Sequence, residues 1–143
     1  MLGEITMAYY ITKLCKGCGV CLKICPSNAV SGEKRSLHTI DDKLCIECGA
    51  CGRICPYNSI ENSFGRICNR ISKKLWEKPV INLKKCVACV ICIDVCPTGS
   101  LEIDYQKNIK ESKIPVLSGE KKCIGCGFCA YECPVEAITM EII

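Results

Sequence analysis

The residues of this chain with the most evident chemical capacity are its cysteines. They number 17 among 143 residues, above the share of about 8–10% that already marks an unusual class of protein. All but Cys68 fall into four runs with one spacing, C-x2-C-x2-C-x3-C-P. The runs are Cys15, Cys18, Cys21, Cys25; Cys45, Cys48, Cys51, Cys55; Cys86, Cys89, Cys92, Cys96; and Cys123, Cys126, Cys129, Cys133.

Thiols at this density serve disulfides, zinc or iron–sulfur clusters. Disulfide scaffolds belong to oxidising compartments and require export, and residues 1–15 lack the basic and apolar segments of a signal peptide. No stretch approaches the roughly 18–20 apolar residues of a membrane span. We therefore expect a metal-binding protein of the cytoplasm.

The spacing favours iron–sulfur clusters over zinc. Three thiolates two residues apart can wrap one loop around a cubane, with backbone N–H groups turned toward its sulfides. The fourth Cys begins the next element, and the proline after it fixes the turn. Zinc sites use paired C-x2-C knuckles separated by a longer span, often with histidine. The single histidine, His38, lies outside every run, and we expect it at the surface.

The four runs resemble those of bacterial-type two-cluster [4Fe–4S] ferredoxins, and the whole chain is similar to a small polyferredoxin. The resemblance implies an α+β, ferredoxin-like fold of order βαββαβ, repeated twice and joined by a helical linker. Short β-prone segments flank the runs in that order. The expected parts are a ferredoxin domain at residues 1–62, a linker at 63–78 and a second ferredoxin domain at 79–143.

The resemblance also implies four [4Fe–4S] clusters, because the fourth Cys of each run binds the cluster of its paired run. Tandem pairing, favoured by four equally regular runs, gives these sets: Cys15, Cys18, Cys21, Cys55; Cys45, Cys48, Cys51, Cys25; Cys86, Cys89, Cys92, Cys133; and Cys123, Cys126, Cys129, Cys96. Nested pairing joins the first run to the fourth and the second to the third. It is similar to the four-cluster subunits of hydrogenases and of molybdopterin or tungsten dehydrogenases.

One run departs from the others. The residue before the third Cys is Gly19, Gly49 and Gly127 in three runs but Val90 in the remaining one. Glycine tolerates positive φ and close backbone approach. Val90 therefore indicates a locally different loop around a drier cluster with a shifted potential, or a tolerated variation without consequence.

The predicted linker carries neither the Cys runs nor their flanking strands. Apolar side chains recur in it at helical spacing: Phe64, Ile67, Ile71 and Leu75. Seven basic and one acidic residue give the segment 63–85 a charge of +6. We expect a basic amphipathic helix that packs on its own domains or docks on a partner protein or a membrane surface. Trp76 is its anchor or an exposed contact, and Cys68 is a small buried apolar residue or a spare ligand or redox thiol.

Charge and ligand count favour electron transfer over other functions. The formal charge is +4, but four clusters of about −2 each lower it to about −4, so we expect no nucleic-acid partner. Cys-ligated clusters leave no open iron site, and the chain lacks a nucleotide fingerprint and a nucleophile–base pair. We expect a low-potential carrier, or a non-catalytic subunit of an anaerobic oxidoreductase such as a hydrogenase or dehydrogenase complex, with redox proteins as donor and acceptor. The alternative of another class is a zinc- or cluster-stabilised binding module.

Overall fold

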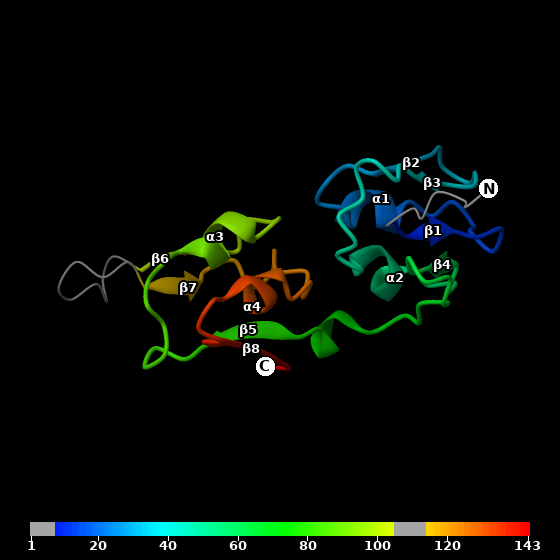
Figure 1. Cartoon of the computed structure of the whole chain (residues 1–143). Helices are drawn as coiled ribbons and strands as arrows, with labels where there is room; N and C mark the ends of the chain where they lie inside the picture. Colours follow the sequence, from blue (N-terminus) through cyan, green and yellow to red (C-terminus); the bar gives the residue numbers. More distant parts are fainter. Residues whose placement is uncertain (1–7, 105–113) are drawn as a thin grey trace. The chain divides into compact units, whose positions relative to one another are not determined.

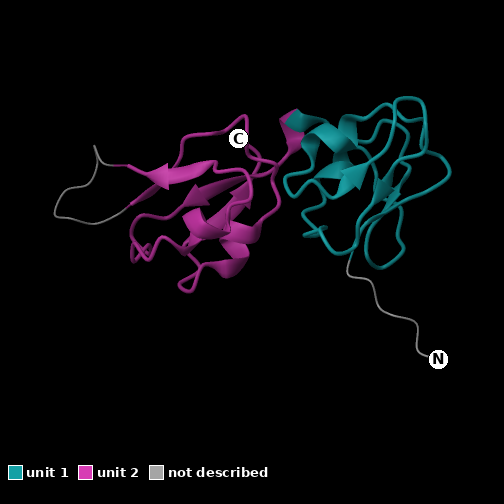
Figure 2. Ribbon diagram, turned by 90° about the horizontal axis from the view of Figure 1, so that it is seen from above, with its two compact units in different colours: residues 1–73 teal, residues 74–143 magenta. Residues whose placement is uncertain are grey.

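The chain forms two small α+β units. The computed structural model describes residues 8–104 and 114–143. The first unit ends at Lys73 and the second begins at Lys74 (Figures 1 and 2). The division falls inside the segment 63–78 that the sequence predicts to be a linker.

The first unit runs strand, helix, two strands, helix, strand (Figure 1). The elements are β1 (Tyr10–Ile11), α1 (Val20–Ile24), β2 (Val30–Ser31), β3 (Thr39–Ile40), α2 (Ala50–Ile54) and β4 (Ile60–Glu61). The first strand pairs with the last, β1 with β4, and the middle strands β2 and β3 pair with each other, both antiparallel. This closure brings the two Cys loops of the unit together.

The second unit repeats the order with longer strands. Its elements are β5 (Lys78–Ile81), α3 (Ile91–Val95), β6 (Leu101–Ile103), β7 (Pro115–Leu117), α4 (Phe128–Glu132) and β8 (Ile138–Glu141). Again the outer strands β5 and β8 pair antiparallel, from Lys78 opposite Glu141 to Ile81 opposite Ile138. The inner strands β6 and β7 form the other antiparallel pair.

The residues at both ends limit each of the four helices to a length of five residues. Each begins after a residue in the left-handed region; Gly19 before α1 has φ 80° and ψ 5°. Each ends at the last Cys of a run, and Cys25 after α1 is extended, with φ −64° and ψ 116°. The residue before a proline avoids the helical region, so the Cys-Pro step both stops the helix and turns the fourth thiol away from its own loop.

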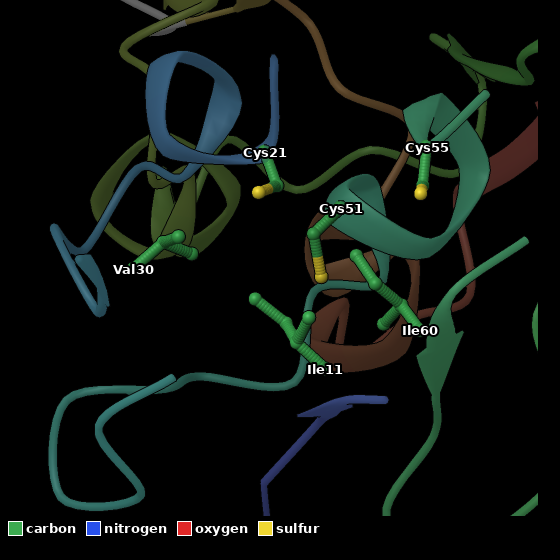
Figure 3. Packing of buried hydrophobic residues seen from close by; sticks show 6 residues of the cluster. All are labelled: Ile11, Cys21, Val30, Cys51, Cys55 and Ile60. Carbon is green, nitrogen blue, oxygen red and sulfur yellow. The ribbon is translucent and has the colours of Figure 1, made fainter. Parts of the chain in front are cut away.

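The thiols themselves make up much of the small core. In the first unit the buried residues are Ile11, Cys21, Val30, Cys51, Cys55 and Ile60 (Figure 3). In the second unit Cys92 and Cys129 are buried together with Leu101 and Ile138. Because aliphatic packing is sparse around these sulfurs, what they bind must contribute to stability.

The helix predicted over residues 63–78 is wrong. The chain turns at Asn62, whose side-chain oxygen accepts hydrogen bonds from the backbone N–H of Phe64 (2.9 Å) and Arg66 (3.0 Å). Gly65 follows the turn with φ +77°, a conformation that interrupts a helix. The only helical turn in the described part of this segment is a 3-10 turn at Lys73–Leu75. Asn62 thus supplies a side-chain turn where helical spacing indicated a helix start.

After the turn the segment packs on the first unit. Ile67 forms an antiparallel bridge with Glu61, and the Cys68 N–H donates to the carbonyl of Ile60 at 2.8 Å. Cys68 then lies against α2, where its Sγ is 2.7 Å from the place that a Cβ on Gly52 would occupy. The segment is therefore an added edge of the first unit.

Two other side chains are buried. Trp76 is 4% exposed and lies beside Gly125 in the second unit. It is therefore not an exposed contact, and the helix that it was predicted to anchor does not form. The prediction of a surface histidine is wrong, because His38 is 2% exposed. Its Nδ1 lies 2.9 Å from the Ser36 carbonyl oxygen, and its ring packs over Gly32.

Candidate metal centres

The structure gathers the Cys runs in pairs. We call the groups site 1 (Cys15, Cys18, Cys21, Cys55), site 2 (Cys45, Cys48, Cys51, Cys25), site 3 (Cys86, Cys89, Cys92, Cys133) and site 4 (Cys123, Cys126, Cys129, Cys96). The four cysteines of site 2 line one cavity. Those of site 3 line a second cavity, and those of site 4 a third.

The thiols of site 1 also lie near enough to one another to interact electrostatically. Burial raises the pKa of Cys21 to about 11, and the nearby thiolates of Cys15, Cys18 and Cys55 act in the same direction. Like charges this close make the thiolate costly. A cation or a positively charged cluster core among these sulfurs removes that cost.

The third cysteine of every run is buried; these residues are Cys21, Cys51, Cys92 and Cys129. Burial raises the pKa of Cys129 to about 12, with further repulsion from Cys126 and Cys123. Burial also raises the pKa of Cys51 and of Cys92. In contrast, Cys18 and Cys89, in the middle of the first and third runs, are exposed, so sites 1 and 3 each reach the surface at one sulfur.

Backbone N–H groups point at the sulfurs. The N–H of Gly17 donates to Cys15 at 3.3 Å, and that of Ala88 to Cys86 at 3.4 Å. These donors sit inside the loop, two residues after the first Cys of the run. They stabilise thiolate sulfur and any negative charge that is shared with it.

The last cysteine of each run receives a second set of donors. Cys25 accepts from the Ala29 N–H at 3.3 Å and lies 3.6 Å from the Ser27 hydroxyl. Although burial opposes the shift, these hydrogen bonds lower the pKa of Cys25. Cys96 accepts from the Ser100 N–H at 3.3 Å, and its pKa is likewise lowered in spite of burial. These two thiols are the ones best prepared to ligate.

The donor sets fit a [4Fe–4S] cluster. Such a cluster takes four Cys thiolates, and sites 2, 3 and 4 each offer four thiols around a cavity, with N–H donors directed at sulfur. Within residues 8–104 and 114–143, no three His, Cys, Asp or Glu side chains converge as a site for a single metal ion. The sulfurs therefore surround a space rather than a point.

The chemistry of the sequence located the thiols but missed their hydroxyl partners. Ser59, 1% exposed, places its hydroxyl 3.0 Å from the sulfur of Cys55. Thr98 lies 3.6 Å from the sulfur of Cys96 and is itself 2.6 Å from the Ser100 hydroxyl. The available signal was a Ser or Thr two or four residues after the last Cys of a run. Cys68, outside the runs, packs behind α2 at Gly52.

Comparison with known proteins agrees with this reading of the thiols. A family model described as a 4Fe-4S dicluster domain matches residues 14–59, 44–100 and 85–137. No curated protein matches the chain.

Two solved structures are similar to parts of the chain. One is in a formate dehydrogenase – heterodisulfide reductase – formylmethanofuran dehydrogenase complex from Methanospirillum hungatei, with 24% identity and a TM-score of 0.40. That match covers 89% of this chain and 52% of the other, so this chain spans about half the length of its relative. The other is ferredoxin I from Desulfovibrio africanus, with 19% identity and a TM-score of 0.36, covering 46% of this chain and 95% of that one.

The helices are short. Among the described residues, no helix has the length and apolar character needed to cross a membrane.

Proposed function

This chain belongs to the 4Fe-4S dicluster domain family, and we propose that it transfers electrons through four [4Fe–4S] clusters held at sites 1 to 4. The observation that carries the proposal is the grouping of the thiols. Three cavities are each lined by three cysteines of one run and the last cysteine of another. A cubane bound at four thiolates accepts and returns one electron at a time.

Tandem pairing of the runs is part of the proposal. Cys25 lines the cavity of site 2 with the second run, and Cys133 lines that of site 3 with the third run. Each exchange takes place inside one unit. Nested pairing would instead combine runs that belong to different units.

We propose electron transfer and no catalysis by this chain. Four thiolates per cluster fill the protein coordination of every iron, which leaves no position for a substrate. Donor and acceptor are then redox proteins that approach an exposed cluster edge. Cys18 and Cys89 are the exposed ligands, so sites 1 and 3 are the proposed points of exchange. A reducing compartment such as the cytoplasm suits free thiols and clusters.

The chain serves either as a free low-potential carrier or as a subunit of a larger oxidoreductase. In both roles its own residues bind the clusters, exclude water from the buried sulfurs and direct N–H groups at them. Opposite charge on a partner would steer the encounter, and the basic stretch 63–85 with its +6 charge is the candidate contact.

Metal analysis of protein purified without oxygen tests the proposal. We expect about 16 iron and 16 sulfide per chain, with visible absorbance that bleaches on reduction and EPR signals of reduced clusters. Zinc without sulfide would overturn electron transfer in favour of a zinc-stabilised binding module.

A pair of variants tests the pairing. Cys25→Ala removes one cluster, and under tandem pairing adding Cys48→Ala removes no further cluster, so about 12 irons remain in both proteins. Cys25→Ala with Cys126→Ala should leave about 8. Under nested pairing the two counts are exchanged: Cys25→Ala with Cys48→Ala should leave about 8 irons, and Cys25→Ala with Cys126→Ala about 12. Cys68→Ala is the matched control and should retain all four clusters.

A further inference from the structure

The last cysteine of each run sits in one repeated environment. The residue four positions later is small and almost fully buried in all four repeats: Ala29, Ser59, Ser100 and Ala137 are between 1% and 2% exposed. In three repeats its N–H donates to the cysteine sulfur, at 3.2 Å for Ala137 on Cys133. The four positions are thus equivalent in the sequence and in burial, and two of them carry a hydroxyl.

Three of these cysteines also have a hydroxyl nearby. Ser27 lies 3.6 Å from the sulfur of Cys25, and Ser59 lies 3.0 Å from that of Cys55. Cys96 has Thr98 at 3.6 Å, with the Ser100 hydroxyl behind it. Toward a thiolate, each of these hydroxyls is the donor.

Cys133 is the exception. The positions that hold serine or threonine in the other repeats are Val135 and Ala137 here. Among the residues that the structure describes, the only hydrogen bond to the Cys133 sulfur comes from the Ala137 backbone. Cys133 is the ligand that this run gives to site 3.

Three acidic side chains stand beside ligands of site 3 in the sequence, although Lys84 and Lys85 directly precede Cys86. The residue two positions after the third cysteine is Lys23 in α1 and Arg53 in α2, but Asp94 in α3. Cys133 itself stands between two exposed carboxylates, Glu132 before it and Glu136 after it. Exposed charges act weakly through solvent, but these three all oppose an added electron.

The walls of the cavities also differ. Beside its cysteines, site 3 is lined only by apolar residues: Ile81, Val87, Val90, Pro115, Pro134, Val135, Ala137 and Ile138. The site 2 cavity includes Tyr9 and Ser27, and the site 4 cavity includes Thr98 and Ser100. An apolar wall stabilises added negative charge less than hydroxyl dipoles do.

From these observations we propose that site 3 holds the cluster of lowest reduction potential in the chain, which rests on the proposed function. Reduction adds one electron from an external donor to the cluster and makes it more negative, so the missing hydroxyl donor and the apolar wall each disfavour it. The cluster at site 3 is the last to be reduced and the first to give its electron away. Cys89 exposes this cluster at the surface, so the strongest reductant among the partners exchanges electrons there.

The test installs the missing hydroxyl. Ala137→Ser places at site 3 the side chain that Ser59 has at the same position of the first unit. We expect it to raise the lowest of the four one-electron waves in an anaerobic, EPR-monitored titration. The expected rise is three- to tenfold in the reduction constant, and tenfold equals 59 mV for one electron. Ser59→Ala is the matched reverse and should lower a different wave.

Asp94→Asn provides a second variant at an exposed position, which avoids any packing change. It should raise the same lowest wave. The proposal is overturned if either site 3 variant shifts a wave of higher potential while the lowest wave stays in place. It is also overturned if Ser59→Ala shifts one of the four waves and neither site 3 variant shifts a wave. Iron and sulfide are counted first: fewer than about 16 of each contradicts the four-cluster function itself, whereas a full count with the wrong wave moved contradicts only the assignment of site 3.

Discussion

Gly52→Ala is the substitution that most directly tests the packing of residues 63–71 on the first unit. Gly52 lies inside α2, where alanine normally stabilises a helix by about 1 kcal/mol over glycine. Here a Cβ would meet the Cβ of Cys68 at 2.6 Å and its Sγ at 2.7 Å. Since non-bonded carbons prefer about 3.5–4.0 Å, the segment must move by about 1 Å.

The cost of that movement decides whether Gly52→Ala stabilises or destabilises the protein. Overpacking of a well-packed site costs about 1–3 kcal/mol, and the Cys68 N–H bond to Ile60 at 2.8 Å is in the part that must shift. Set against the helix gain of about 1 kcal/mol, the net loss of stability is about 0–2 kcal/mol. For a unit of this size each kcal/mol lowers the midpoint by about 4–8 °C.

The assay is the apparent melting midpoint of the cluster-loaded protein, followed by visible absorbance without oxygen at one fixed heating rate. Cys68→Gly removes both clashing atoms, so Gly52→Ala should become neutral or stabilising in that background, with a coupling of about 1–3 kcal/mol. Ala130→Gly, at the equivalent position of α4, removes a Cβ that packs on the hydrophobic cluster of the second unit as well as the helix preference of alanine, so it should destabilise. If Gly52→Ala stabilises the protein that still has Cys68, the segment does not pack on α2 and our reasoning is refuted.

Three further outcomes follow from the loops and thiols. Val90→Gly should raise the midpoint, because valine at φ 59° bears about 1–2 kcal/mol of left-handed strain; an unchanged or lower midpoint would show that the loop has relaxed. Gly17→Ala should lower the free energy of unfolding by about 2–4 kcal/mol, because the new Cβ would meet the Ser36 backbone. Gly99→Ala, with no described atom within 4 Å of its Cβ, should lower it by only about 1 kcal/mol. Equal losses in the two variants would contradict the contact with Ser36. Burial raises the pKa of Cys129 to about 12, so the thiol keeps its proton in the cluster-free protein and releases it when a cluster binds. The fraction of protein loaded with cluster at limiting iron and sulfide should therefore increase between about pH 7 and 9. A loaded fraction that does not change with pH would count against a buried thiol.

The residues that begin and end the helices can be recognised in the sequence. A glycine able to take positive φ precedes α1, α2 and α4, and a Cys-Pro step ends every helix. The same steps turn the last thiol of each run away from its own loop. The family resemblance predicted an α+β fold, and the structure is α+β with short helices and strands.

The segment after the first unit was not readable in this way. Its apolar side chains recur at helical spacing, but Asn62 and Gly65 form a turn that reverses the chain onto β4. A local side-chain hydrogen bond competes with the helix there, and the partner of Cys68 is a glycine 16 positions earlier. No periodicity within the segment contains that information. His38 was missed for a similar reason, because its burial depends on Gly32 across the β2–β3 hairpin.

Because the four Cys loops repeat one backbone conformation, the residues at equivalent positions of the loops can be compared directly. A residue that differs at an equivalent position needs a local cause, since the fold around it is the same. Gly52 stands where the other repeats have Leu22, Ile93 and Ala130, and Cys68 crossing α2 supplies the cause. At the position of Ala137 the fold accepts serine in two repeats and alanine in another, so packing does not select between them there. What does change with that hydroxyl is the hydrogen bonding of a ligand sulfur, and therefore the energy of an added electron. In the proposed function, differences of this kind give the clusters at the four sites different reduction potentials.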